Sequence, residues 1–105
     1  MPRSMTYRDA LREALREELI RDERIFLLGE DIEDPFGGTY KVTQGLTEEF
    51  GHDRVRNTPI SEIAITGVAL GAAMTGMRPV AELMYVDFAG CAMDQIMNQI
   101  AKMRY

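Results

Sequence analysis

The sequence has little of what metal sites, disulfides and membrane spans require. Cys91 is the only cysteine and His52 the only histidine among 105 residues, so the four nitrogen or sulfur ligands of a structural metal site are absent. A lone cysteine cannot form an internal disulfide, which favours a reducing compartment, and we expect a cytoplasmic protein. No apolar run reaches the roughly 20 residues that span a bilayer, and no signal-peptide pattern is visible. We therefore expect neither a metal ligand set nor membrane binding in this chain.

Positive charge is also in short supply. The chain has 12 Lys and Arg against 17 Asp and Glu, a net charge of −5, which argues against nucleic acid as a partner. The glycine pair in Phe36–Gly38 lacks the Lys and Ser/Thr of a phosphate-binding loop. His52 and Cys91 lie on different predicted elements, and no spacing supports a Ser–His or Cys–His nucleophile. Acidic side chains are the remaining candidates for chemistry.

What the chain does contain is typical of one small globular domain. It is 46% hydrophobic and 28% charged, which are ordinary values for such proteins, and its length suffices for a single domain. Eight methionines are many for this length. Their clustering at Met93, Met97 and Met103 predicts a surface that packs on another element or a partner.

The apolar pattern alternates between helical and strand periods. Helix and strand signals of this kind, taken in turn, favour βαβ units with a parallel sheet, so the predicted fold class is α/β, with a parallel sheet and flanking helices. The predicted elements, in chain order, are a helix over about 7–21 that begins with a capping box at Thr6–Asp9, a strand at 25–29, a short helix through Val42, Leu46 and Phe50 that ends at Gly51, a weak strand at 54–57, a helix from 62 to about 75, a strand at 78–84 and a helix from Ala92 onward.

Three candidate residues fall at or just past the carboxyl ends of the predicted strands, where parallel sheets bind ligands. They are Glu30, Glu62 and Phe88. Each also has an ordinary structural explanation. Glu30 can be the polar end of a buried strand, Glu62 can stabilise a helix dipole by about 0.3–1 kcal/mol, and Phe88 can be a core residue. Glu82, inside a predicted strand, is expected to form a structural ion pair.

The residues around Glu62 carry the most specific pattern. Pro59 disfavours helix upstream and Ser61 can cap the next helix, which places Glu62 in its first turn. Gly67 and Gly71 then give this helix a face without bulky side chains, which another backbone can approach closely. The order glutamate, four residues, glycine, hydrophobe, two residues, glycine resembles the pyrimidine-domain motif of thiamine diphosphate enzymes.

Further blocks resemble, more narrowly, the beta subunit of the E1 component of 2-oxo acid dehydrogenase complexes. The resemblance extends from Met5 to the end of the chain, and it implies that residues 1–105 are part of a transketolase-like pyrimidine-binding domain. The matching blocks are Leu28–Asp31, Thr39–Leu46, Thr58–Glu62, Arg78–Glu82, Asp87–Phe88 and Asp94–Lys102.

The resemblance implies thiamine diphosphate as the cofactor. Its diphosphate and metal, expected to be Mg²⁺, would be held by an E1 alpha subunit and its aminopyrimidine by this chain. Glu62 would hydrogen-bond the pyrimidine N1′ and so promote proton removal from the thiazolium, which requires a carboxyl group sheltered from water. Phe88 would pack against the ring, Ile60 would line the same pocket, and Glu30 would join acidic residues that relay protons between paired active sites.

The resemblance also implies partners and a reaction. The partners would be the E1 alpha subunit, a second beta subunit across the Gly67/Gly71 face, and lipoyl-E2 as acyl acceptor, in oxidative decarboxylation of a 2-oxo acid or in acetoin cleavage. Such beta subunits are longer, so we expect a fragment that is inactive alone and self-associates through an uncovered strand edge. The alternative is a non-catalytic flavodoxin-like α/β binding or assembly module, in which Glu62 is only a helix-terminal charge.

Overall fold

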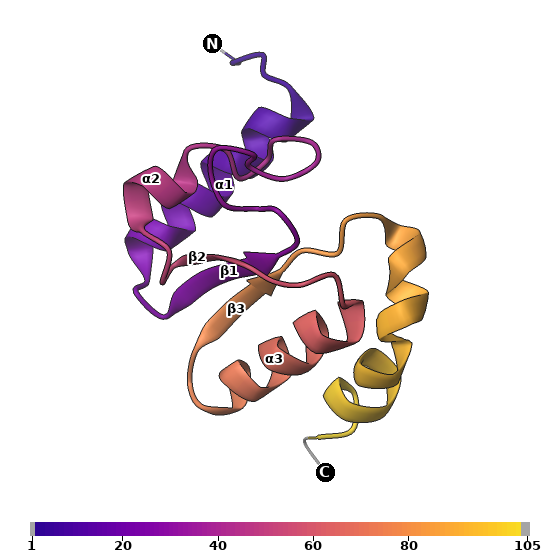
Figure 1. Ribbon diagram of the computed structural model, residues 1–105. Coiled ribbons are helices and arrows are strands. Elements are labelled where there is room, and N and C mark those ends of the chain that lie inside the picture. Colours follow the sequence, from indigo (N-terminus) through magenta and orange to yellow (C-terminus); the bar gives the residue numbers. More distant parts are fainter. Residues whose placement is uncertain (1, 104–105) are drawn as a thin grey trace.

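In the computed structural model, which describes residues 2–103, three parallel strands form the centre of the molecule (Figure 1). The strand order is β2-β1-β3, so the first strand lies between the other two. The predicted parallel sheet is confirmed. The elements are α1 (Tyr7–Arg21), β1 (Ile25–Gly29), α2 (Leu46–Phe50), β2 (Val55–Asn57), α3 (Glu62–Met74), β3 (Arg78–Ala81), a 3-10 helix η1 (Val86–Ala92) and a π-helical segment η2 (Asp94–Ile100).

The strand β1 is covered on both faces. Ile25 and Leu27 belong to a buried cluster with residues of α1 and α2, whereas Phe26 and Leu28 pack with Ile65 of α3 on the opposite face. Figure 1 shows α1 and α2 on one side of the sheet and α3 on the other. All five residues of β1 are buried, which explains why its sequence is a continuous apolar run rather than an alternating one.

Helix boundaries follow the capping residues seen in the sequence. The Thr6 hydroxyl oxygen accepts a hydrogen bond from the Asp9 N–H at 3.1 Å, and the Ser61 hydroxyl oxygen accepts one from the Ala64 N–H at 3.3 Å. Gly51, with a left-handed φ of 89°, ends α2. Because the Ser61 cap fixes the start of α3, Glu62 is its first residue, as predicted.

Three boundary predictions were wrong. The short helix was expected to include Val42, but α2 begins at Leu46, because the left-handed φ of 89° at Gly45 interrupts the helical backbone before it. The third strand ends at Ala81 instead of Met84: its last pair is with Leu28, and β1 ends one residue later at Gly29, so no strand within residues 2–103 runs beside 83–84. The last segment is not one α-helix from Ala92, but the 3-10 helix η1 followed by η2. Gly90 within η1 is a poor helix former, and both segments take their shape while packed on α3.

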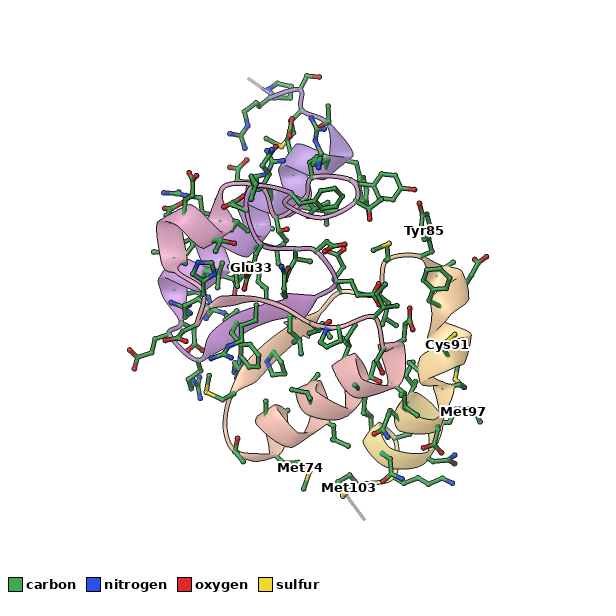
Figure 2. The ribbon with its side chains drawn as sticks, in the orientation of Figure 1. Glu33, Met74, Tyr85, Cys91, Met97 and Met103 are labelled. Carbon is green, nitrogen blue, oxygen red and sulfur yellow. The ribbon has the colours of Figure 1, made fainter. Side chains whose placement is uncertain are left out.

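The methionines predicted to form a packing surface lie on the outside. Met93, Met97 and Met103 are each more than a third exposed, and Figure 2 shows Met97 on the outer side of η2. A partner for this surface stays a prediction.

Within residues 2–103, no helix is both long enough and apolar enough to cross a membrane.

Gly29 is expected to tolerate no side chain. A Cβ at this position would lie 3.0 Å from the Glu82 Cβ and 3.2 Å from both the Glu82 carbonyl oxygen and the Ile32 Cγ2. We predict that Gly29→Ala lowers the free energy of unfolding by about 1–3 kcal/mol, the usual cost of overpacking, measured by urea denaturation. Gly90→Ala is the control, because a Cβ there meets no atom within 4 Å. Equal stability of the two variants would contradict the prediction.

Candidate functional site

Glu30 and Glu62 meet where β1 ends and α3 begins. Glu30 directly follows β1, and only 6% of the residue is exposed. The Thr58 N–H donates to the Gly29 carbonyl oxygen at 2.9 Å, which fixes the chain leading into α3 beside the end of β1. Glu62 is partly buried at the first position of that helix. We call these two carboxyl groups the Glu30–Glu62 pair.

The electrostatics of the Glu30–Glu62 pair favour the retention of a proton. Burial raises the pKa of Glu30, and the negative charge of Glu62, a hydrogen bond between the two carboxyl groups and the charge of Asp31 raise it further. A second negative charge beside a buried carboxylate is costly, so the protonated form of Glu30 is favoured. The arrangement can therefore hold a proton at the junction of strand and helix.

A third glutamate, Glu82, joins the same end of the sheet. Its N–H donates to the Leu28 carbonyl oxygen at 2.9 Å. Burial first, and then the charge of Glu30, raise the pKa of Glu82. The structural ion pair predicted for Glu82 is wrong: none of the ion pairs between residues 2–103 includes it. The edge position of β3 leaves this carboxyl group partly open to water, so it needs no cation beside it.

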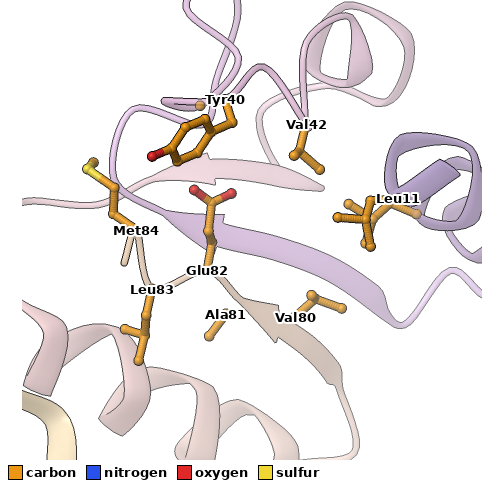
Figure 3. A pocket seen from close by; sticks show the side chains of 10 residues that line it. Leu11, Tyr40, Val42, Val80, Ala81, Glu82, Leu83 and Met84 are labelled. Carbon is orange, nitrogen blue, oxygen red and sulfur yellow. The ribbon is translucent and has the colours of Figure 1, made fainter. Parts of the chain in front are cut away.

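Glu82 instead points into a pocket of about 420 Å³ (Figure 3). The pocket lies between α1, the loop after β1 and the edge strand β3. Its lining is mostly apolar, and Glu82 contributes the only carboxyl group. The other lining residues are Leu11, Leu15, Gly38, Tyr40, Val42, Val80, Ala81, Leu83 and Met84.

Aromatic side chains lie beyond the carboxyl end of β3. Phe88 is partly buried in η1, which packs against α3 near its first turn (Figure 1). The ring of Tyr85 lies edge-to-face with the ring of Phe88, with centroids 5.6 Å apart, and in the same way with the ring of Tyr40 at 5.9 Å. No local pattern points to Tyr40 or Tyr85 as a contacting pair, because their contact depends on how the loop after β1 folds back. Ile60 is 81% exposed, so its predicted role in lining a pocket stays a prediction.

The small-residue face of α3 is partly occupied by the chain itself. A Cβ on Gly67 would lie 3.4 Å from the Gln95 Oε1 of η2, whereas a Cβ on Gly71 would meet no atom within 4 Å. Only the Gly71 end of the predicted face is therefore open to a partner.

Within residues 2–103, no group of three or more His, Cys, Asp or Glu side chains is arranged to hold a metal ion.

The family model described as "Transketolase, pyrimidine binding domain" matches residues 3–105. This chain belongs to that family. The parallel three-stranded sheet with helices on both faces agrees with the pyrimidine-binding domain's α/β architecture. The fold class and the family expected from the residues around Glu62 are confirmed.

Three curated relatives of this pyrimidine-binding domain are named as beta subunits, two of dehydrogenases and one of an acetoin oxidoreductase. The chain is 52% identical to the 2-oxoisovalerate dehydrogenase subunit beta of Bacillus subtilis, over 96% of this chain and 31% of that protein. It is 50% identical to the pyruvate dehydrogenase E1 component subunit beta of Rickettsia bellii, with the same coverage. It is 44% identical to the acetoin:2,6-dichlorophenolindophenol oxidoreductase subunit beta of Bacillus subtilis, over 100% of this chain and 34% of that protein. The chain thus spans about a third of the length of these relatives.

Replacement of Glu30 by Gln should stabilise the pyrimidine-binding domain at neutral pH. The folded-state pKa of Glu30 is raised above its unfolded value. The contribution of this carboxyl group to the free energy of unfolding is therefore fully present below the unfolded pKa, about 4.3. It is lost as the pH rises through the folded-state pKa. Glu30→Gln has no such loss. We predict that its stability relative to the parent increases between pH 4 and pH 7, as measured by urea denaturation.

The control for this comparison is Glu23→Gln, because Glu23 is exposed in the turn after α1. Its stability relative to the parent should change little with pH. A Glu30→Gln variant that behaves like Glu23→Gln across this range would show that Glu30 titrates as an ordinary surface carboxyl group.

Proposed function

We propose that this chain provides the aminopyrimidine-binding part of a thiamine diphosphate site in the E1 beta subunit of a 2-oxo acid dehydrogenase. The observation that carries the proposal is the Glu30–Glu62 pair, held at the junction of β1 and α3 beside the helix that contains Phe88. The family match and the names of the relatives support it.

The chemistry of the residues fits an aminopyrimidine. A carboxyl group that retains a proton can hydrogen-bond a ring nitrogen, and the partly buried Phe88 and the exposed Ile60 offer apolar surface to ring faces. The cofactor, when bound, supplies an electron sink for the decarboxylation of a 2-oxo acid. Glu62 is the residue we assign to the pyrimidine N1′.

Each of the chain's residues has a distinct task in this proposal. Glu62 would hydrogen-bond the pyrimidine N1′. Burial and the neighbouring negative charge raise the pKa of Glu30, so Glu30 would keep a proton beside Glu62. Phe88 packs on the ring and fixes its orientation. The Ser61 cap fixes the first turn of α3, so the Glu62 carboxyl group is held in one place.

The remaining parts of the proposed enzyme lie on partners. An E1 alpha subunit would hold the diphosphate and Mg²⁺, and lipoyl-E2 would accept the acyl group. A second beta subunit would approach the Gly71 end of α3, where an added Cβ would meet no atom of another element within 4 Å among residues 2–103. Relatives named for 2-oxoisovalerate, pyruvate and acetoin are similarly close in identity, so the proposal extends to the 2-oxo acid and acetoin classes.

A chimera tests the role of Glu62. The 105 residues replace the matching segment of the Bacillus subtilis 2-oxoisovalerate dehydrogenase subunit beta, which is assayed with its alpha subunit. We predict that Glu62→Gln lowers kcat about 10²- to 10⁴-fold, the usual range for loss of a positioned acid–base group, with the folded structure retained by circular dichroism. Glu48→Gln is the matched control, because Glu48 is also an acidic residue in the first turn of a helix.

A thiamine diphosphate analogue with CH in place of N1′ gives a second test of this role. With this analogue, the parent and Glu62→Gln chimeras should be equally inactive, because neither can form the hydrogen bond between residue 62 and N1′. Full activity of Glu62→Gln with thiamine diphosphate would overturn the proposal and favour the flavodoxin-like module, in which Glu62 is only a helix-terminal charge.

The Gly71 end of α3 allows a separate test of subunit contact. We predict that Gly71→Leu does not lower the unfolding free energy of the 105-residue chain, because leucine is a better helix former than glycine at this exposed position, but weakens the association of two beta subunits of the chimera in analytical ultracentrifugation. Unchanged assembly would show that no partner helix crosses α3 at this point.

A further inference from the structure

Tyr85 lies between two other aromatic rings. Its ring centroid is 5.6 Å from that of Phe88 with an interplanar angle of 88°, and 5.9 Å from that of Tyr40 with an angle of 83°. Both contacts are edge-to-face, the geometry that aromatic quadrupoles favour. We call these three side chains the aromatic ladder. Figure 2 shows Tyr85 at the surface, between the loop after β1 and η1.

The outer end of the aromatic ladder is attached to a well-anchored loop. The Arg12 guanidinium of α1 donates to the carbonyl oxygens of Lys41 and Val42, and Lys41 itself has a left-handed φ of 63°. The Thr43 hydroxyl donates to the Ile32 carbonyl oxygen at 2.7 Å. These bonds fix the backbone that carries Tyr40. The Tyr40 ring therefore limits the movement of the Tyr85 ring that contacts it.

The inner end of the ladder is tied to η1. The Phe88 N–H donates to the Tyr85 carbonyl oxygen at 3.0 Å, so the backbone holds Tyr85 and Phe88 on consecutive turns, and the ring contact then restricts the Phe88 side chain. The neighbouring Tyr85 hydroxyl group, more than burial, raises the pKa of Tyr40. Tyr85 is 43% exposed, so it contributes to the surface more than to the core.

We propose that Tyr85 is a positioning residue that holds the Phe88 ring, through the aromatic ladder, in the orientation that receives the aminopyrimidine. The inference rests on the proposed function, because it gives Phe88 the cofactor contact. Tyr85 itself need not touch the cofactor. It acts by limiting the rotamers of Phe88, so that the ring is ordered before the cofactor arrives and less conformational freedom is lost on binding.

The first test uses nuclear magnetic resonance on the full 105-residue chain. In the parent and in Tyr85→Phe, the Phe88 ring protons should show contacts with the ring at position 85 and a single side-chain rotamer. In Tyr85→Leu we expect those contacts to vanish and the Phe88 rotamers to average. Tyr7→Leu is the matched control, because Tyr7 is 84% exposed on α1 and should leave Phe88 unchanged. A Phe88 ring that stays equally ordered in Tyr85→Leu would overturn the proposal.

The second test measures the KM for thiamine diphosphate in the chimera described above. Tyr85→Leu should raise this KM about 2- to 12-fold, which converts the usual value of one edge-to-face contact, with a smaller change in kcat. Tyr85→Phe should restore the parent value, because it keeps the ring. A disordered Phe88 with an unchanged KM would overturn the inference and leave the proposed function intact. Full activity of Glu62→Gln would instead overturn the proposed function, and the inference with it.

Discussion

The constraint on which the site depends is the burial of β1. This strand is covered on both faces and paired on both edges, so the first polar side chain after it, Glu30, cannot escape directly to water. Since all three strands are parallel, the segments that follow them converge at the same end of the sheet. Hydrogen bonds from the Thr58 and Glu82 N–H groups to the last carbonyl oxygens of β1 hold those segments in place. The acidic site is a direct consequence of this topology.

This arrangement is unfavourable for stability and useful for chemistry. Ionisation of a buried carboxyl group beside a second one raises the free energy of the folded state, whereas a surface glutamate ionises without this cost. Perturbed acidic groups of this kind gather at functional sites more often than chance, and local rules for stable sequences are commonly broken there. The Glu30–Glu62 pair fits this pattern, whereas the core under α1 and α2 follows ordinary packing rules.

Features encoded in neighbouring residues could be predicted from the sequence. The caps at Thr6 and Ser61, the buried run of β1 and the start of α3 all depend on local chemistry, and the structure confirms them. The convergence of Glu30 and Glu62 could also be predicted from the sequence, because the carboxyl ends of parallel strands lie at the same edge of the sheet. The end of β3 and the form of η1 and η2 did not follow, because they depend on where a neighbouring strand stops and on packing against α3.

Contacts between segments that are distant in the sequence could not be predicted from sequence patterns. The Tyr40–Tyr85 contact requires the loop after β1 to return to β3, and nothing near either tyrosine indicates this. The position of Glu82, which lines a pocket without an ion-pair partner among residues 2–103, likewise depends on how the loop after β1 and α1 pack beside the edge strand β3. The covering of Gly67 by Gln95 depends on how η2 packs on α3. In each case tertiary structure decided an outcome that local propensity left open.

The most direct test of this account is a carbon-13 nuclear magnetic resonance titration of the Glu30 carboxyl group, in the parent chain and in Glu62→Gln. The account predicts a Glu30 pKa above the ordinary value of about 4.3 in the parent and a lower one in the variant, because the neighbouring charge is removed while burial remains. A Glu30 carboxyl group that titrates at the ordinary value, and does not respond to the change at position 62, would contradict the account.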